Sequence, residues 1–270
     1  MDIAKEKFDF VCSLGGNCMA ASQLQQRGLR IFSLPFDWLF YKDSTPIYRL
    51  IECFKDNFQH FLLKENLREL HGDEITDAHN NMLQYQDTYT EIFFYNHFSK
   101  KIDNNGEFKK VKEKITRRIE RFLYFLNKSN KILFIFSHHY NFENKPYIEL
   151  YNFLKEFYPD KEIHIRVIQF GTNEPSFEYD DARLMITRIK RENNYYDFTK
   201  TNIEWQFLDN IECDLSKFEN NKPKSAILKI QKIKKGVFFS LFPKINTLIY
   251  FKLYLFGLRI FFSFGKNRVE

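Results

Sequence analysis

Three apolar runs separated by segments of helical character restrict most strongly the folds open to this chain. They are FDFVCSL (8–14), KILFIFSHH (131–139) and EIHIRVIQFG (162–171). A helix-compatible stretch follows the first run, and an amphipathic segment that stops near Pro159 joins the other two. Strands that alternate with helices favour a mainly parallel sheet with helices on its faces. We therefore predict an α/β fold, built on a mainly parallel sheet flanked by helices.

The remaining segments of the body carry weaker signals. Apolar residues at helical spacing predict helices over 46–58 and over 111–126. The run EIFFYNHF (91–98) is strand-like, and the polar stretch at 65–90 is expected to be loop. Two weaker strands are expected, near 182–189 and near 203–208.

Charge is distributed unevenly along the chain. The net charge is +6, but residues 222–270 contain eleven Lys or Arg and one acidic residue, which leaves −4 for residues 1–221. Nucleic-acid binders usually carry a basic face on the folded domain, so we expect no nucleic-acid partner. A basic, aromatic terminal segment is more typical of contact with a membrane surface. We expect residues 222–270 to bind the inner-membrane surface.

The change in charge and composition along the chain predicts a catalytic domain at 1–215, a basic linker at 216–236 and a tail at 237–270. A spanning helix needs about 20 predominantly apolar residues. Proline and charged residues interrupt the tail at Pro243, Lys244, Lys252 and Arg259. We therefore expect a basic, aromatic, amphipathic helical tail that lies in the membrane interface. The alternative is a helical pair that packs on the body.

The four cysteines form no C-x-x-C pair, and the first residues lack the apolar run of a signal peptide. Both observations favour the reducing cytoplasm, so we expect a cytoplasmic protein, peripheral on the inner membrane. No Cys and His spacing matches a closed metal site, and we expect no metal.

The segment SLGGNC (13–18) carries the strongest chemical signal. A thiol at the start of a helix experiences the partial positive charge of the helix N-terminus, which lowers its pKa toward a usable thiolate. Cys18 is therefore a candidate nucleophile, and the turn of Gly15 and Gly16 could offer backbone N–H groups to an oxyanion. Asn17 could add a side-chain donor. The alternative is a tight structural turn in which Cys18 begins a buried helix face.

A nucleophilic cysteine usually needs a histidine base. His97 ends a strand-like run, and His138 and His139 end the run at 131–139, where sites in open α/β sheets assemble. His97 is our candidate, with His138 and His139 as alternative bases. Asp37 lies between two aromatic residues and could orient the histidine as a third catalytic residue. Alternatively, it caps the next turn or pairs with Arg30.

Four motifs together resemble a known family. They are SLGGNC (13–18), RGLRIFSLPFDWLF (27–40), FFYNHF (93–98) and ITRRIERFLYFLNKSNKILFIF (115–136). In this order they resemble a bacterial family described as papain-like cysteine peptidases, a domain of unknown function (DUF1796-like). The resemblance implies a dyad of Cys18 and His97.

Members of that family often lie in capsule or lipopolysaccharide gene clusters, and a related capsule family with a Gly-Asn-Cys motif is credited with acetyl transfer from acetyl-CoA. The resemblance therefore implies a Cys–His acyltransferase or glycan-modifying transferase that acts on a saccharide or lipid-linked glycan, with acetyl-CoA as a possible acyl donor. The alternatives are a papain-like thiol hydrolase, cleaving peptides or amides, and a non-enzymatic scaffold of the capsule machinery.

Overall fold

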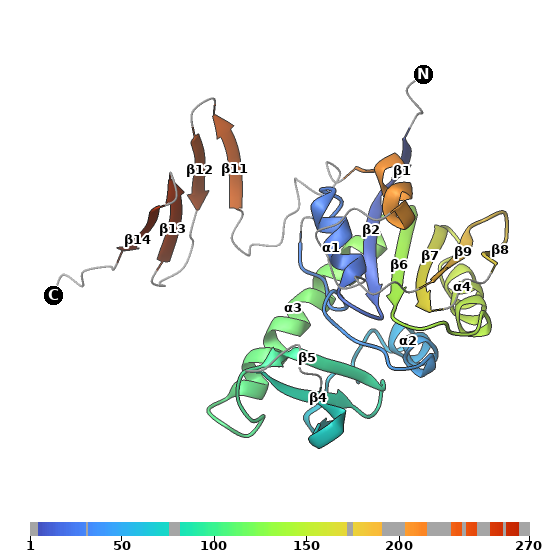
Figure 1. The fold of residues 1–270 in the computed structure, drawn as a ribbon, viewed down its shortest axis with the longest axis horizontal. Coiled ribbons are helices and arrows are strands. Elements are labelled where there is room, and N and C mark those ends of the chain that lie inside the picture. The colour runs from blue at the N-terminus through green and yellow to red at the C-terminus, as the bar shows by residue number, and fades with distance from the viewer. Residues whose placement is uncertain are drawn as a thin grey trace. The chain divides into compact units, whose positions relative to one another are not determined.

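A computed structural model of the chain describes residues 5–30, 32–75, 82–171, 175–190 and 203–214, together with four strands in the C-terminal segment. A five-stranded sheet forms the centre of the body, in the order β2-β6-β7-β9-β8 (Figure 1). Its strands are β2 (Phe10–Gly15), β6 (Lys131–His138), β7 (Glu162–Gly171), β9 (Leu184–Lys190) and β8 (Phe177–Tyr179). All neighbours are parallel except β8 and β9. The predicted α/β fold is therefore confirmed, including the strand expected near 182–189.

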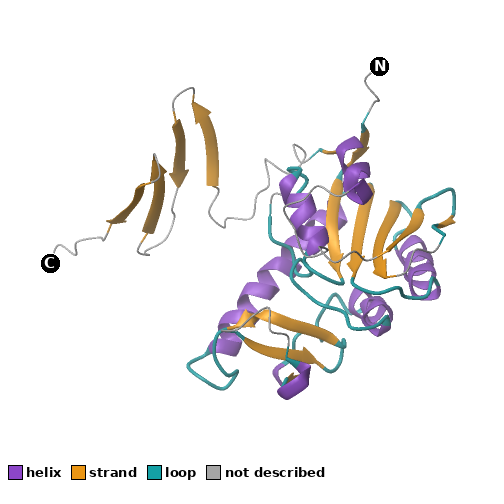
Figure 2. Cartoon of the chain, viewed as in Figure 1, coloured by secondary structure: helices purple, strands orange, loops and turns teal. Residues whose placement is uncertain are grey.

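Within the residues that the structure describes, four α-helices accompany this sheet (Figure 2). They are α1 (Met19–Gln26), α2 (Thr45–Lys55), α3 (Glu107–Lys128) and α4 (Lys145–Phe157). Pro46 and Pro146 stand in the first turns of α2 and α4, where a missing backbone N–H leaves no hydrogen bond unmade. In α3 the buried positions recur every three or four residues, as its apolar spacing predicted.

The two faces of the central sheet belong to different apolar clusters. Along β6, Ile132, Phe134 and Phe136 contribute to the larger cluster. Leu133 and Ile135, which alternate with them, contribute to the smaller one, together with residues of α1. Strands buried on both faces explain why the sequence shows continuous apolar runs rather than alternation.

A second sheet is antiparallel and lies apart from the first in Figure 1. It contains β3 (Leu67–Glu69), β4 (Leu83–Asp87) and β5 (Ile92–Phe98). The expectation that 65–90 is loop was therefore wrong for β3 and β4, and two short 3-10 helices, η1 (Lys64–Asn66) and η2 (Gly72–Glu74), also lie there. Gln84, Gln86 and Asp87 are buried on β4, so polar composition hid a strand whose polar side chains point inward.

The segment expected as a strand near 203–208 is instead a 3-10 helix, η4 (Ile203–Asn210). Trp205 and Leu208 are buried and lie three residues apart, which is the repeat of a 3-10 helix. The short strands β1 (Glu6–Phe8) and β10 (Ile211–Cys213) pair in parallel beside it.

The chain divides into two compact units, residues 1–218 and 219–270. The second contains two antiparallel hairpins, β11 (Leu228–Ile233) with β12 (Gly236–Leu241) and β13 (Ile249–Leu255) with β14 (Leu258–Phe264). The prediction of a helical tail was therefore wrong. These segments are rich in Ile, Phe and Tyr, whose side chains favour strands. Among the residues that the structure describes, every helix falls short of the length and apolar character needed to span a membrane.

Candidate active site at the glycine turn

The turn between β2 and α1 is built on two glycines with positive φ, +95° at Gly15 and +94° at Gly16. L-amino acids rarely adopt such angles. A Cβ atom at Gly16 would lie 2.5 Å from Cε1 of His138 and closer still to the backbone oxygen of Ser137. The turn therefore brings its own backbone directly against the carboxyl end of β6, and only glycine fits there.

Tyr41 holds this turn in place. Its phenol donates a hydrogen bond to the carbonyl oxygen of Leu14 at 2.6 Å. Its backbone N–H donates a hydrogen bond to the carbonyl oxygen of Gly16 at 3.1 Å. A Cβ atom at Gly15 would lie 2.7 Å from the phenol oxygen, so the ring packs on the backbone of this glycine as well. Tyr41 is itself fully buried. Nothing in the sequence around Tyr41 marks a contact with the turn, so this residue was not among the predicted site residues.

Asn17 and Cys18 follow at the start of α1. The side-chain oxygen of Asn17 accepts a hydrogen bond from the backbone N–H of Met19 at 2.9 Å. Its amide nitrogen is buried and has no hydrogen-bond partner within the described residues. Asn17 therefore stabilises the helix start and retains the donor that an oxyanion would require.

Cys18 occupies the N-cap position of α1 and is partly buried. Burial raises the pKa of its thiol above the ordinary value, although its own backbone N–H lowers the pKa in part. This is opposite to the lowering that we expected from the helix N-terminus. Removing a thiolate from water outweighs the partial charge of an eight-residue helix. In the free protein Cys18 is therefore a neutral thiol that needs a base.

His138, the last residue of β6, is the histidine whose ring contacts the glycine turn. It is fully buried among aromatic side chains, with ring centroids 4.6 Å from Phe142, 5.9 Å from Tyr147 and 6.0 Å from Tyr41. Neither ring nitrogen has a hydrogen-bond partner within the described residues. Burial, and to a lesser extent the neighbouring His139, lowers its pKa to about 3. The imidazole is therefore neutral and has a free acceptor for a proton.

The other two candidate bases have different surroundings. The half-buried His139 packs on Phe40, with ring centroids 5.6 Å apart. His97 lies on β5 of the antiparallel sheet, so its position at a strand end does not place it at the carboxyl edge of the parallel sheet. Its ring contacts Phe94, and burial lowers its pKa to about 3, with a smaller effect of Lys114 and Arg118 on α3. Within the described residues, its Nδ1 has no hydrogen-bond partner.

Asp37 makes the contacts expected of a turn cap that pairs with Arg30. Its Oδ2 accepts hydrogen bonds from Nε of Arg30 at 2.8 Å and from the backbone N–H of Leu34 at 2.7 Å. Burial raises the pKa of this carboxyl, and the charge of Arg30 opposes that rise. The carboxylate therefore caps a turn and pairs with Arg30, while a role in orienting a histidine stays a prediction.

Together, a thiol, a neutral imidazole and an unused amide donor are brought to one turn by β2, β6 and α1. This set of groups is suited to attack on a carbonyl carbon. Ser137 adds a buried hydroxyl without a partner among the described residues, which the sequence analysis overlooked. Within the same part of the chain, no three His, Cys, Asp or Glu side chains lie together as a metal site would need.

His97 and His138, two of the buried histidines, make stability depend on pH. Their pKa of about 3 in the folded state lies below the unfolded value of about 6.5. The unfolded chain therefore binds more protons, and the stability that is present above pH 6.5 is lost as the pH falls toward 3. Urea unfolding should show a decline of up to about 1.4 kcal/mol per pH unit for each histidine.

The variant His138→Leu isolates one of these contributions. Its unfolding free energy should fall less steeply between pH 6.5 and 4 than that of the parent protein. The parent protein, unfolded under the same conditions, provides the reference slope. Equal slopes in the parent and in His138→Leu would show that His138 is protonated in the folded state.

Comparison with known proteins links this region to a family. The family model described as "Putative papain-like cysteine peptidase (DUF1796)" matches residues 9–172, more than half of the chain. An uncharacterized protein, R408, of Acanthamoeba polyphaga mimivirus is 30% identical over 132 residues, covering 46% of this chain and 59% of the relative. The chain thus spans less than two thirds of this relative's length. No solved structure matches.

The family match agrees with the resemblance that the four motifs carried. The relative is a viral protein, so these comparisons do not support the bacterial origin that we expected. They also provide no support for a relation to capsule acetyltransferases, whereas the family description favours a thiol hydrolase.

Proposed function

Because the chain belongs to the DUF1796 family, we propose that it is a cysteine-dependent hydrolase of amide or peptide bonds, with Cys18 as its nucleophile. One observation carries the proposal. Cys18 starts a helix directly after a glycine turn whose second glycine packs on His138, and both nitrogens of this imidazole are unused within the described residues. A buried polar group without a partner costs about 1–3 kcal/mol, and a role in proton transfer would account for its presence.

In this mechanism His138 accepts the thiol proton as Cys18 Sγ attacks the carbonyl carbon of the substrate. The carbonyl oxygen takes up negative charge, and the amide nitrogen of Asn17 donates a hydrogen bond to it. The imidazolium then returns the proton to the leaving amine as the C–N bond breaks, which leaves an acyl-thioester on Cys18. Water, deprotonated by His138, releases the acid and restores the thiol.

The choice of His138 departs from the resemblance, which implied His97. The reason is position, since the ring of His138 contacts the turn that carries Cys18, whereas the neighbours of His97 are Phe94 and the basic residues of α3. The proposal assigns Cys18 as nucleophile, His138 as base and Asn17 as oxyanion donor. It assigns no direct catalytic role to His97, His139 or Asp37.

The acyltransferase that the sequence analysis ranked first would use the same acyl-thioester, with a sugar hydroxyl in place of water. Product analysis separates the two. A peptide substrate incubated with and without an oligosaccharide acceptor should yield free acid in both cases. Acylated sugar as the main product would restore the transferase, along with the glycan and acetyl-CoA predictions. Binding of residues 222–270 to the inner membrane stays a prediction.

Alkylation tests the nucleophile directly. With iodoacetamide and site-resolved mass spectrometry, Cys18 should react at least about tenfold faster than Cys213, which is also partly buried and whose pKa is raised to about 11. The rate at Cys18 should still rise above pH 8.5, because burial raises its pKa.

Replacement of the proposed base, His138, tests whether it accelerates alkylation of Cys18. His138→Gln should slow alkylation of Cys18 and leave Cys213 unchanged, because glutamine cannot take up the thiol proton. If Cys18 reacts as slowly as Cys213, the thiol is a structural residue, and the scaffold alternative replaces the hydrolase.

A further inference from the structure

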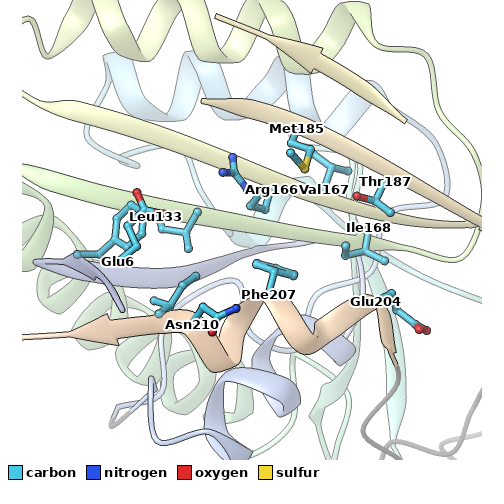
Figure 3. A pocket seen from close by; sticks show the side chains of 12 residues that line it. Glu6, Leu133, Arg166, Val167, Ile168, Met185, Thr187, Glu204, Phe207 and Asn210 are labelled. Carbon is cyan, nitrogen blue, oxygen red and sulfur yellow. The ribbon is translucent and has the colours of Figure 1, made fainter. Parts of the chain in front are cut away.

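One face of the central sheet is covered unevenly. Helix α1 packs on β2 and β6, and η4 contributes Trp205 and Leu208 to the same apolar cluster. Over β7 and β9 a cavity of about 360 Å³ remains, bounded by these strands, by η4 and by β1 (Figure 3). Ligand pockets commonly have volumes of about 300 Å³ or more. The cavity is therefore large enough for a small organic molecule.

The lining is mainly apolar. Five apolar side chains, each from a different strand or helix, provide this surface: Phe8, Leu133, Ile168, Met185 and Phe207. Figure 3 shows the last four around the opening, with Leu133 and Ile168 on the sheet and Phe207 on η4 facing them. Such a surface suits a hydrocarbon or aromatic body rather than a sugar.

Arg166 of β7 adds a cation to this lining. Its Nη1 donates hydrogen bonds to backbone oxygens, at 2.7 Å to Ala182 and at 3.3 Å to both Ile165 and Arg183. These bonds anchor the side chain. Within the described residues, Nε and Nη2 make no hydrogen bond, so the guanidinium keeps donors for a ligand.

The other charges around Arg166 do not neutralise it directly. Among the described residues no carboxylate lies within ion-pair distance of its guanidinium, and Glu6, which also lines the cavity, pairs with Lys131 at 2.9 Å. Burial lowers the pKa of Arg166, against the opposing effect of Glu6 and Glu178, but an arginine stays protonated at any physiological pH. A partly buried cation with free donors favours an anionic group.

We propose that this cavity binds a small amphipathic carboxylate, with its anionic end on Arg166 and its apolar body on Leu133, Ile168 and Phe207. A guanidinium can donate two parallel hydrogen bonds to a carboxylate. At about 30 Å³ for each water-sized group, the cavity takes about twelve non-hydrogen atoms. The site contains neither Cys18 nor His138, so it is independent of the proposed hydrolysis.

The test uses the full chain with ¹³C-methyl-labelled methionine, because the sequence contains only four methionines. Met185 lines the cavity, and Met19 on α1 serves as an internal control. The probe is 4-phenylbutyrate, which matches the cavity in size, and Met185→Leu assigns the signal. Titration should shift the Met185 methyl signal to saturation, with a millimolar or tighter dissociation constant, and leave that of Met19 in place.

Two comparisons test the recognition. The amide of the probe, which has the same shape and no charge, should bind at least tenfold more weakly. Arg166→Gln should weaken binding of the carboxylate by a similar factor. Thr187→Phe fills the cavity and keeps both Arg166 and Met185, so it should abolish binding even if the Arg166 variant fails to fold.

Three outcomes overturn the proposal. The first is a shift at Met185 that does not saturate or is shared by Met19. The second is equal affinity for the amide and the carboxylate, which removes the role of Arg166. The third is unchanged binding in Thr187→Phe, which places the probe outside the cavity.

Discussion

Replacement of His138 by leucine is expected to abolish hydrolysis, by at least about 10³-fold in kcat/KM, and to make the protein more stable. The imidazole has no hydrogen bond within the described residues and is surrounded by Phe136, Phe142, Tyr147 and Tyr41, so an apolar side chain of similar size suits the site better. A gain of about 1–2 kcal/mol is expected at pH 7. Peptide cleavage assays and urea unfolding supply the two measurements.

His97→Leu is the matched control, because His97 is also buried, has an unpartnered Nδ1 within the described residues and has a pKa lowered to about 3. It should keep hydrolysis within a few-fold of the parent, whereas Cys18→Ser should match His138→Leu in its loss. If His97→Leu is inactive and His138→Leu is active, the base is His97, as the family resemblance implied. Loss of stability in His138→Leu would assign His138 a structural role.

Gly16→Ala should unfold the protein or destabilise it by more than about 3 kcal/mol. Its φ of +94° is strained for alanine, and the added methyl group would press on His138 and on the backbone oxygen of Ser137. Backbone atoms at the end of a central strand cannot move aside without breaking the pairing of β6 with β2 and β7. Chemical denaturation followed by circular dichroism measures the loss.

Gly28→Ala separates backbone strain from packing. Gly28 also has a positive φ, +71°, but nothing lies within 4 Å of a Cβ atom built there. This variant should therefore lose only about 1 kcal/mol. Similar losses for the two variants would mean that the contact of Gly16 with β6 contributes little to stability.

The prediction of the fold succeeded where burial on both faces leaves a continuous apolar run. Most residues of the runs that became β2, β6 and β7 are apolar and buried, so the sequence predicted their type and their mainly parallel arrangement. The same reasoning failed for β4, because its polar residues Gln84, Gln86 and Asp87 are typical of a loop in sequence but are buried in the structure. It also failed in the C-terminal segment, where an apolar and basic composition suggested helices and the structure has hairpins.

For the site, the sequence indicated the kind of residue and the position along the chain. SLGGNC indicated a thiol at a helix start, and three histidines at strand ends were possible bases. Spacing alone could not choose among them, because contact across a sheet depends on strand order and register. The burial that raises the pKa of Cys18 was equally invisible, since burial is a property of the folded structure and not of a short motif.

The sequence by itself determined the parallel α/β sheet, the glycine turn and the cysteine that follows it, because apolar periodicity and glycine act locally. Only the tertiary structure decided which histidine meets that turn. Pairing of β2 with β6 aligns Gly15 with Phe136 and so brings the end of β6 to the turn, while β5 carries His97 into a separate sheet. A register between strands about 120 residues apart is a property of the packed core, and no short motif specifies it.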